Sequence, residues 1–128
     1  MPLVVFDSSA FLALLWNENG SEMAKTYQDD FIIGSVNAAE VFTKVMDRNP
    51  FAETQSKNQL LAMTMKIVPF DGQQALLCAD IRNTTRKFGL SLGDRACLAL
   101  AIRENAVVLT ADRAWAELDI GVKIKVIR

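Results

Sequence analysis

Residues 91–102 read SLGDRACLALAI, and every position from Ala96 to Ile102 is apolar. A helix that is apolar on all sides is buried on most of them, so we expect this helix in the middle of the fold. Its first turn nevertheless carries Asp94, three residues after Ser91, which is a good N-cap. The segment alone is compatible with Asp94 as part of a cap and with Asp94 as a functional carboxylate.

Short apolar runs elsewhere in the chain are typical of buried strands. They lie at residues 3–6, 31–34, 66–70, 107–110 and within 122–127. Helical patterns alternate with them, which predicts an α/β fold: a three-layer sandwich with a central, mostly parallel five-stranded sheet flanked by helices. The run at 66–70 is expected near the sheet edge, because Pro69 cannot donate to a strand ladder. No linker or repeat is visible, so residues 1–128 are expected to form one domain.

Helices are expected between the strands, and the first of them is predicted to begin with Ser8 or Ser9 as its cap. In the helix that Asp71 is expected to cap and that runs to about residue 87, apolar spacing predicts that Leu76, Leu77 and Ile81 point inward. Arg82, Arg86 and Lys87 are expected nearer water. The other predicted helices cover about 21–27, 35–48, 51–63 and 113–118.

Four acidic residues follow predicted strands or open predicted helices. Asp7 and Asp112 come after strands, whereas Glu40 and Asp94 lie near helix N-termini. In an open parallel sheet, these positions share the edge where ligands bind. Carboxylates brought together there repel one another, and a bound divalent cation removes that cost. Because the donors are all oxygen, the expected cofactor is Mg²⁺ or Mn²⁺.

These acids lie in segments that resemble the four motifs of PIN-domain ribonucleases. The segments are Asp7-Ser8-Ser9-Ala10, Ser35-Val36-Asn37-Ala38-Ala39-Glu40, the helix that carries Asp94, and Thr110-Ala111-Asp112-Arg113. Their order and the chain length are most similar to those of VapC toxins from toxin–antitoxin pairs. The resemblance covers nearly the whole chain, from Leu3 to the last predicted strand.

The resemblance implies a metal-dependent endoribonuclease in which an activated water cleaves RNA and leaves a 3′-hydroxyl and a 5′-phosphate. Asp7 and Asp94 would bind the metal directly. Glu40 would complete the ligand shell or orient the water, and Asp112 would bind directly or through water. Some relatives carry a further polar or acidic residue shortly after the fourth motif, where this chain has Trp115 and an alanine. The sequence therefore leaves open whether the site holds one metal ion or two.

Neighbouring polar residues are candidates for orienting these acids or for binding substrate. The candidates for hydrogen bonds to the carboxylates are Ser8, Ser9, Asn37, Ser91 and Thr110, and those for substrate phosphate are Arg95 and Arg113. Ser35 is a further candidate of this kind. For both Ser35 and Ser91, helix capping is the preferred interpretation. For the two arginines, a solvated or salt-bridged side chain is the simpler interpretation.

Composition limits the other functions. The chain has 14 basic and 15 acidic residues and no histidine, which disfavours general phosphate binding and excludes a histidine base. Cys78 and Cys97 fall in apolar helical stretches and are expected to be reduced, as in a cytoplasmic protein. No uninterrupted apolar stretch is long enough for a membrane span. By resemblance, the partners would be the RNA substrate, a cognate antitoxin and a second copy of the chain.

Two alternatives remain at this point. The first is a PIN fold that only binds a partner and cleaves nothing. The second is a receiver-like phosphoacceptor domain with Asp71 as the acceptor and Thr110 at a later strand end. The second is weaker, because Asp7 is followed by serines instead of another acid, and because Glu40 and Asp94 would have no function in it.

Overall fold

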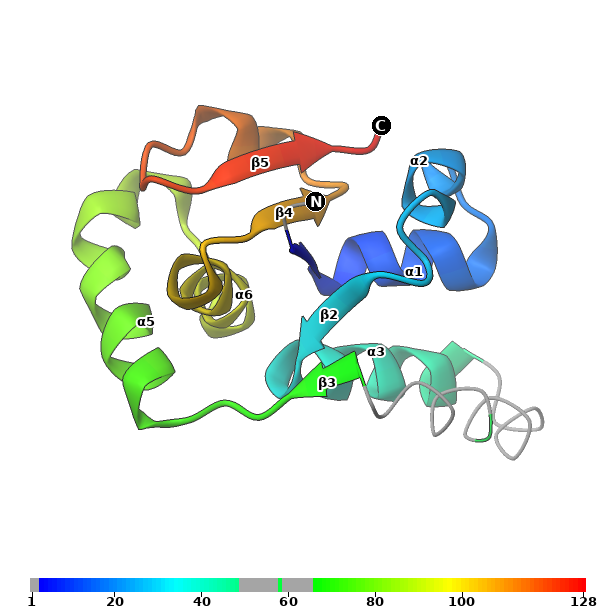
Figure 1. Cartoon of the computed structure of the whole chain (residues 1–128), viewed down its shortest axis with the longest axis horizontal. Helices are drawn as coiled ribbons and strands as arrows, with labels where there is room; N and C mark the ends of the chain where they lie inside the picture. Colours follow the sequence, from blue (N-terminus) through cyan, green and yellow to red (C-terminus); the bar gives the residue numbers. More distant parts are fainter. Residues whose placement is uncertain (1–2, 49–57, 59–65) are drawn as a thin grey trace.

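The computed structural model describes residues 3–48, 58 and 66–128 of the chain (Figure 1). Its strands form one five-stranded sheet in the order β3-β2-β1-β4-β5. All four neighbouring pairs are parallel. The strands are β1 (Val4–Phe6), β2 (Phe31–Gly34), β3 (Ile67–Val68), β4 (Val107–Thr110) and β5 (Lys123–Val126). The predicted parallel sheet is confirmed, and so is the edge position of the strand before Pro69.

Helices cover both faces of this sheet, so the predicted three-layer architecture is also confirmed (Figure 1). The helices are α1 (Ser8–Trp16), α2 (Ser21–Lys25), α3 (Ser35–Arg48), α5 (Gly72–Thr85), α6 (Leu92–Glu104) and the 3₁₀ helices η3 (Arg86–Phe88) and η4 (Arg113–Glu117). The helix predicted at 51–63 falls almost entirely outside the described residues. None of the helices within the described ranges is long and apolar enough to cross a membrane.

Alternating residues of β1 send their side chains to opposite faces of the sheet. Val4 and Phe6 pack in one core with residues of α1, α2 and α3. Val5 packs in the second core with residues of α5, α6 and η4, including Leu98 and Trp115. Trp115 is buried, as expected for a core tryptophan. A strand buried on both faces explains why the sequence of β1 is a continuous apolar run.

Helix α6 is the buried helix that its sequence predicts. Residues 96–101 are each at most 3% exposed, and Cys97 is fully buried. The helix ends at Asn105, which adopts the left-handed conformation with φ of 51°. Because α6 packs on the centre of the sheet, its N-terminus is held in a fixed position relative to the ends of the strands.

Two local predictions are wrong. Helix α1 is capped by Asp7, whose carboxylate accepts a hydrogen bond from the backbone of Ala10, so neither Ser8 nor Ser9 is its cap. In α5, Leu76 is 75% exposed instead of buried. The buried positions of α5 are Gln74, Cys78, Ile81 and Thr85.

Candidate active site

The topology brings the four predicted acids toward one edge of the sheet. β1 lies between β2 and β4, and all three strands run in the same direction. Asp7 directly follows β1, Asp112 follows β4 by two residues, and Glu40 lies in α3, which begins directly after β2. Asp94 lies in the first turn of α6. The carboxyl-terminal edge of a parallel sheet is the usual position of a ligand site.

Asp7 is the most buried of these acids, at 5% exposure. Its Oδ1 accepts hydrogen bonds from Ser9 Oγ at 2.7 Å and from the Ala10 backbone N–H at 2.8 Å. Thr110 Oγ1 donates to its other oxygen, Oδ2. Burial raises the pKa of Asp7 from 3.8 to about 6, although these three hydrogen bonds oppose the shift and the charge of Asp94 adds to it. Desolvation therefore dominates at this carboxyl.

The hydroxyls of Ser9 and Thr110, which donate to Asp7, connect this acid to the loop that carries Asp112. Ser9 Oγ accepts a hydrogen bond from the Ala111 N–H at 2.9 Å, and Thr110 Oγ1 accepts one from the Asp112 N–H at 3.0 Å. Each hydroxyl has one proton, which it donates to Asp7. The predicted contacts of Ser9 and Thr110 with a site carboxylate are thus present. The Asp112 carboxylate itself is exposed and accepts a hydrogen bond from the Ala114 N–H at the start of η4.

Glu40 is held against the N-terminus of α6 by Asn37. The Asn37 Nδ2 group donates to Glu40 Oε1 at 3.1 Å and to the Gly93 carbonyl at 3.0 Å. Asn37 is 2% exposed, so its predicted contact with a site carboxylate is buried. Gly93 is essential to this packing, because a Cβ atom at that position would lie 2.7 Å from both carboxylate oxygens of Glu40.

Asp94 and Ser91 form the capping box that the sequence predicts. The Asp94 N–H donates to Ser91 Oγ at 3.1 Å, and the Ser91 N–H donates to Asp94 Oδ2 at 3.0 Å. Ser91 is exposed and contacts the site through Asp94 alone. Ser35, by contrast, does not act as a cap, because its Oγ accepts a hydrogen bond from the Phe70 N–H. Capping uses only one oxygen of Asp94, so Oδ1 remains available for a second contact.

Three of the acids lie near enough to the buried Cys97 for their charges to affect the pKa of its thiol. Burial raises its pKa well above the ordinary value, and the negative charges of Asp7, Asp94 and Glu40 each raise it further. Cys97 lies one helical turn after Gly93, on the buried part of α6. Glu40 lies against Gly93, and Asp94 follows Gly93 in the first turn of α6, so both acids lie at the N-terminal end of this helix, on the side of the sheet edge where Asp7 follows β1. Both cysteines are free and buried, as predicted.

The donor atoms fit a hard divalent cation. They are all carboxylate oxygens, which suit Mg²⁺ and Mn²⁺. No Lys or Arg in the described ranges forms an ion pair with any of these acids. In the same ranges, no group of three or more His, Cys, Asp or Glu side chains is arranged to hold a metal ion. The structure thus contains converging acids with oxygen donors, but not a closed ligand cage.

Three predicted residues do not contact the acids. Arg95 points to α5, where its Nη1 donates to the Cys78 carbonyl at 3.0 Å. Arg113 Nε donates to the Arg128 carbonyl at 2.9 Å. Ser8 forms no side-chain hydrogen bond with the part of the chain that the structure describes. The sequence analysis also missed Gly93, although a glycine in the first turn of a strongly helical segment is the signal for such a close approach.

Asp71 does not occupy a phosphoacceptor position. Its carboxylate caps α5 through the Gln74 N–H and forms an ion pair with Arg103 at 2.8 Å. It follows edge strand β3, which is separated from β4 and Thr110 by β2 and β1. At about 4.8 Å per strand, that separation is too large for a shared site. The receiver-like alternative is therefore wrong.

Comparison with solved structures gives the same fold. DNA-bound VapBC from Salmonella typhimurium has a chain with a TM-score of 0.78 and 17% identity, covering 100% of both chains. VapBC-5 from Mycobacterium tuberculosis has a TM-score of 0.71 and 22% identity, covering 100% of this chain and 99% of that one. FitAcB from Neisseria gonorrhoeae has a TM-score of 0.70 and 20% identity, covering 94% and 95%. At these identities the likeness shows the fold alone.

Sequence comparison identifies the family. Comparison with the curated proteins gives no match. The family profile described as PIN domain matches residues 4–121, which include strands β1 to β4 and all four acids. The chain therefore belongs to the PIN domain family.

Proposed function

We propose that this protein is a metal-dependent endoribonuclease that acts as the toxin of a toxin–antitoxin pair. The observation that carries the proposal is the convergence of Asp7, Glu40 and Asp94 at the N-terminus of α6, without a cationic side chain of the described residues to neutralise them. Membership of the PIN family and the fold shared with VapBC structures support the same reading.

Mg²⁺ or Mn²⁺ would be held by Asp7 and Asp94, with Glu40 and Asp112 as further ligands, directly or through water. When bound, the ion supplies a Lewis acid that makes water more acidic and neutralises charge on the phosphate. It also offsets the repulsion between the carboxylates, such as that of Asp94 on Asp7, which adds to the effect of burial on the pKa of Asp7.

The residues around the acids fix their orientation. Ser9 and Thr110 both donate to Asp7, so each of its oxygens keeps a defined direction. Asn37 holds one oxygen of Glu40, which leaves the other oxygen of Glu40 to orient a water and accept its proton. In the hydrolysis, the water oxygen bonds to phosphorus and the P–O3′ bond breaks. The 3′ oxygen takes up a proton, giving a 3′-hydroxyl and a 5′-phosphate.

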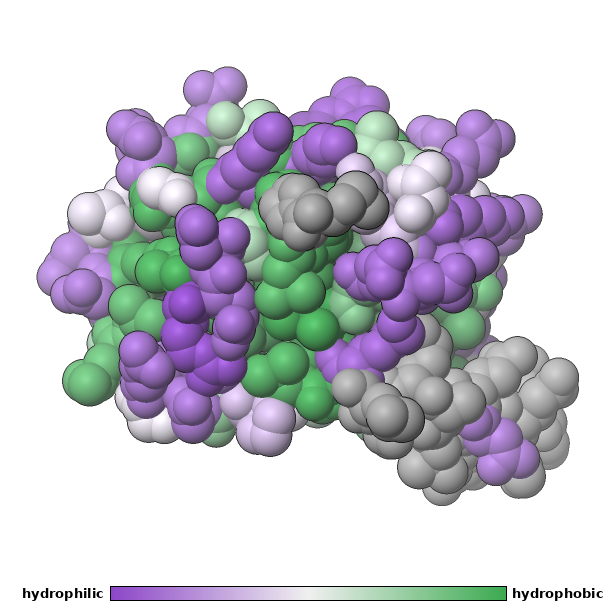
Figure 2. Space-filling model, viewed as in Figure 1, coloured by the Kyte–Doolittle hydropathy of each residue, from purple (hydrophilic) through white to green (hydrophobic). Residues whose placement is uncertain are grey.

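An antitoxin partner is part of the proposal. Two structures that share this fold are described as a toxin–antitoxin complex from Klebsiella pneumoniae and as a member of the VapBC family of toxin–antitoxin systems. A hydrophobic band crosses the visible face between α6 and β2, with hydrophilic side chains on both sides (Figure 2). Exposed apolar surface of this kind is typical of protein–protein contacts. The protein is proposed to form a homodimer that the antitoxin inhibits in the cytoplasm.

The test is cleavage of a mixed pool of structured RNAs by purified protein without antitoxin. Reactions contain Mg²⁺, Mn²⁺ or a chelator, and Asp94→Asn serves as the matched control for contaminating nucleases. We expect cuts that require metal and disappear in the variant, because Asn lacks the charge of the ligand while it still accepts the capping hydrogen bond. The product ends should be a 3′-hydroxyl and a 5′-phosphate.

Equal cutting by both proteins would show that the activity is a contaminant. No cutting by the parent protein, together with stable antitoxin binding, would favour the alternative of a PIN domain that only binds a partner. Expression in cells adds a second readout, since Asp94→Asn should relieve the growth inhibition that the parent toxin causes.

A further inference from the structure

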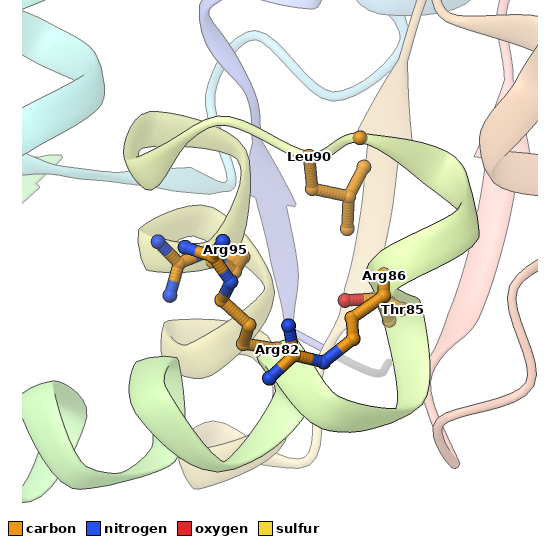
Figure 3. A pocket seen from close by; sticks show the side chains of 6 residues that line it. Arg82, Thr85, Arg86, Leu90 and Arg95 are labelled. Carbon is orange, nitrogen blue, oxygen red and sulfur yellow. The ribbon is translucent and has the colours of Figure 1, made fainter.

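A pocket of about 340 Å³ lies between α5 and α6, apart from the four acids. Its lining includes Arg82 and Arg86 from the end of α5 and the start of η3, and Arg95 from α6. Thr85, Gly89 and Leu90 complete it. Figure 3 shows the three arginine side chains around the pocket, with Arg82 extending toward Arg95 on α6.

The positive charge in this pocket is not neutralised by the described part of the chain. No carboxylate in the described ranges forms an ion pair with Arg82, Arg86 or Arg95. Arg86 donates only to Asn83 Oδ1, at 3.2 Å. Arg82 and Arg86 are four residues apart on one helical face, where like charges repel each other and destabilise a helix. A bound anion would remove this repulsion.

Arg95 is anchored at the pocket by one of its donors. Its Nη1 is fixed by the Cys78 carbonyl, but its Nε is buried and has no hydrogen-bond partner. Burying a donor without a partner is costly, and native structures rarely leave one unsatisfied. The Nε atom is inaccessible to the pocket, so Arg95 contributes its guanidinium charge there and not this donor.

The position of the pocket connects it to the acids. Arg95 directly follows Asp94 in the first turns of α6, and successive helical residues point about 100° apart. The negative charge of Asp94 raises the pKa of Asp7, so Asp94 lies on the side of the acids, whereas Arg95 faces α5. The residues that lead from the pocket into α6 are Leu90 and Ser91, so the two sites lie on adjacent sides of one helix end.

We propose that Arg82, Arg86 and Arg95 bind a backbone phosphate of the RNA strand next to the phosphate that is cleaved. This inference rests on the proposed nuclease function. Guanidinium groups match phosphate through paired N–H donors, and a local arginine cluster compensates for a chain whose net charge is −1. The contact is to the backbone, so the pocket contributes affinity and strand position without reading sequence.

The experiment measures binding separately from cleavage. Fluorescence anisotropy follows a short, single-stranded, mixed-sequence RNA pool in the presence of a chelator, which prevents metal-dependent cutting. The proteins are the parent, Arg82→Gln, Arg86→Gln and the control Lys123→Gln. Lys123 is exposed on β5 and does not line the pocket, and its replacement by Gln removes one positive charge, as in the arginine variants. Arg95 is left intact because it joins α6 to α5.

We expect Arg82→Gln and Arg86→Gln each to weaken RNA binding by about tenfold, and Lys123→Gln by less than twofold. Each arginine variant should also reduce the slope of log affinity against log salt by about 0.7, the value for one lost single-strand phosphate contact. Melting temperatures of all four proteins should agree, because Arg82 and Arg86 are exposed.

The failure of this inference is distinguishable from that of the nuclease function. If the protein cleaves RNA in a metal-dependent way and all variants bind RNA equally, the proposed role of the pocket is refuted. The proposed nuclease function is then still supported. Binding that depends on the arginines, with no cleavage by any protein, would support the pocket and refute the nuclease. The proposal would be overturned if the parent protein did not bind RNA. It would also be overturned if the parent bound an acidic peptide through these arginines while its RNA binding did not depend on them.

Discussion

Asp7 shows how one side chain serves both the fold and the site. It caps α1 through the Ala10 N–H and accepts hydrogen bonds from Ser9 and Thr110. Burial nevertheless raises its pKa to about 6, so the three donors do not fully replace the water that it loses. A metal-free chain with an ionised Asp7 is therefore less stable than it would be with a neutral group.

Asp7→Asn is expected to stabilise the metal-free protein at about pH 8 by roughly 2–3 kcal/mol, since one pKa unit corresponds to about 1.4 kcal/mol. The folded chain holds this proton up to a higher pH than the unfolded chain, for which the pKa is 3.8. Stability therefore falls as pH rises through the window from 3.8 to about 6. The amide keeps the hydrogen bonds from Ser9 and Ala10 and can donate to Thr110.

Chemical denaturation of both proteins in chelator, at about pH 4.5 and about pH 8, measures this difference. The gain should be present at the higher pH and largely absent at the lower one. Asp119→Asn, an exposed change with the same charge difference, controls for net charge. A variant that is less stable than the parent at both pH values would contradict the account of Asp7.

Asn37 joins two elements through a single amide group. Asn37→Ala leaves the Gly93 carbonyl and Glu40 without their donor, which should cost about 1–3 kcal/mol of folding stability. Cleavage should fall about tenfold to a hundredfold, as is typical when a group that orients a metal ligand is removed. Asn19→Ala, in the exposed loop between α1 and α2, is the comparison. Equal cleavage by Asn37→Ala and the parent would show that Glu40 needs no such support.

At the scale of elements, α3 and α6 meet where Gly93 allows Glu40 to approach the helix. A Cβ at position 93 would lie 2.7 Å from the Glu40 carboxylate oxygens. The carboxylate is the far end of a flexible side chain, so it can move away at little cost to the fold. The close approach therefore matters for the position of Glu40 and not for the stability of α6.

Gly93→Ala is expected to preserve or raise the melting temperature, since alanine is favoured over glycine in a helix by about 1 kcal/mol. Cleavage should nevertheless fall at least about tenfold, because Glu40 and its hydrogen bond to Asn37 are displaced. Gly72→Ala in the first turn of α5 is the matched control, because a Cβ there meets nothing within 4 Å. A stable Gly93→Ala protein with full activity would refute this role of Gly93.

The elements could be predicted where their local pattern and their burial agree. The strands at 4–6, 31–34 and 107–110 and the buried α6 were of this kind. The buried face of α5 was harder to predict, because it contains the polar residues Gln74 and Thr85, while Leu76 is exposed. The side chains of Gln74 and Thr85 donate to backbone carbonyls. Polarity alone does not reveal that a polar side chain is buried with its own partner.

The acids of the site could be predicted from their positions after strands and at helix starts, but their contacts could not. The sequence does not show that Asp7 caps α1, that Ser9 and Thr110 both donate to it, or that Gly93 makes room for Glu40. These contacts depend on the register of β1 with β4 and on the docking of α3 against α6. Both are set by tertiary packing.

For the whole molecule, the parallel order β3-β2-β1-β4-β5 explains why function is concentrated at one edge. The central strands deliver Asp7 and the loop of Asp112 there, while α3 and α6 bring Glu40 and Asp94 from the two faces of the sheet. The account's central claim is that these acids form one site for a divalent cation.

Calorimetric titration of Mn²⁺ into chelator-free, antitoxin-free protein tests that claim most directly, with Asp7→Asn, Asp94→Asn and the charge control Asp119→Asn. The account predicts saturable binding by the parent and by Asp119→Asn. It predicts affinity at least about tenfold weaker for each of the other two variants, because each loses one ligand charge. Equal Mn²⁺ affinity in all four proteins, or no binding by the parent, would contradict the account.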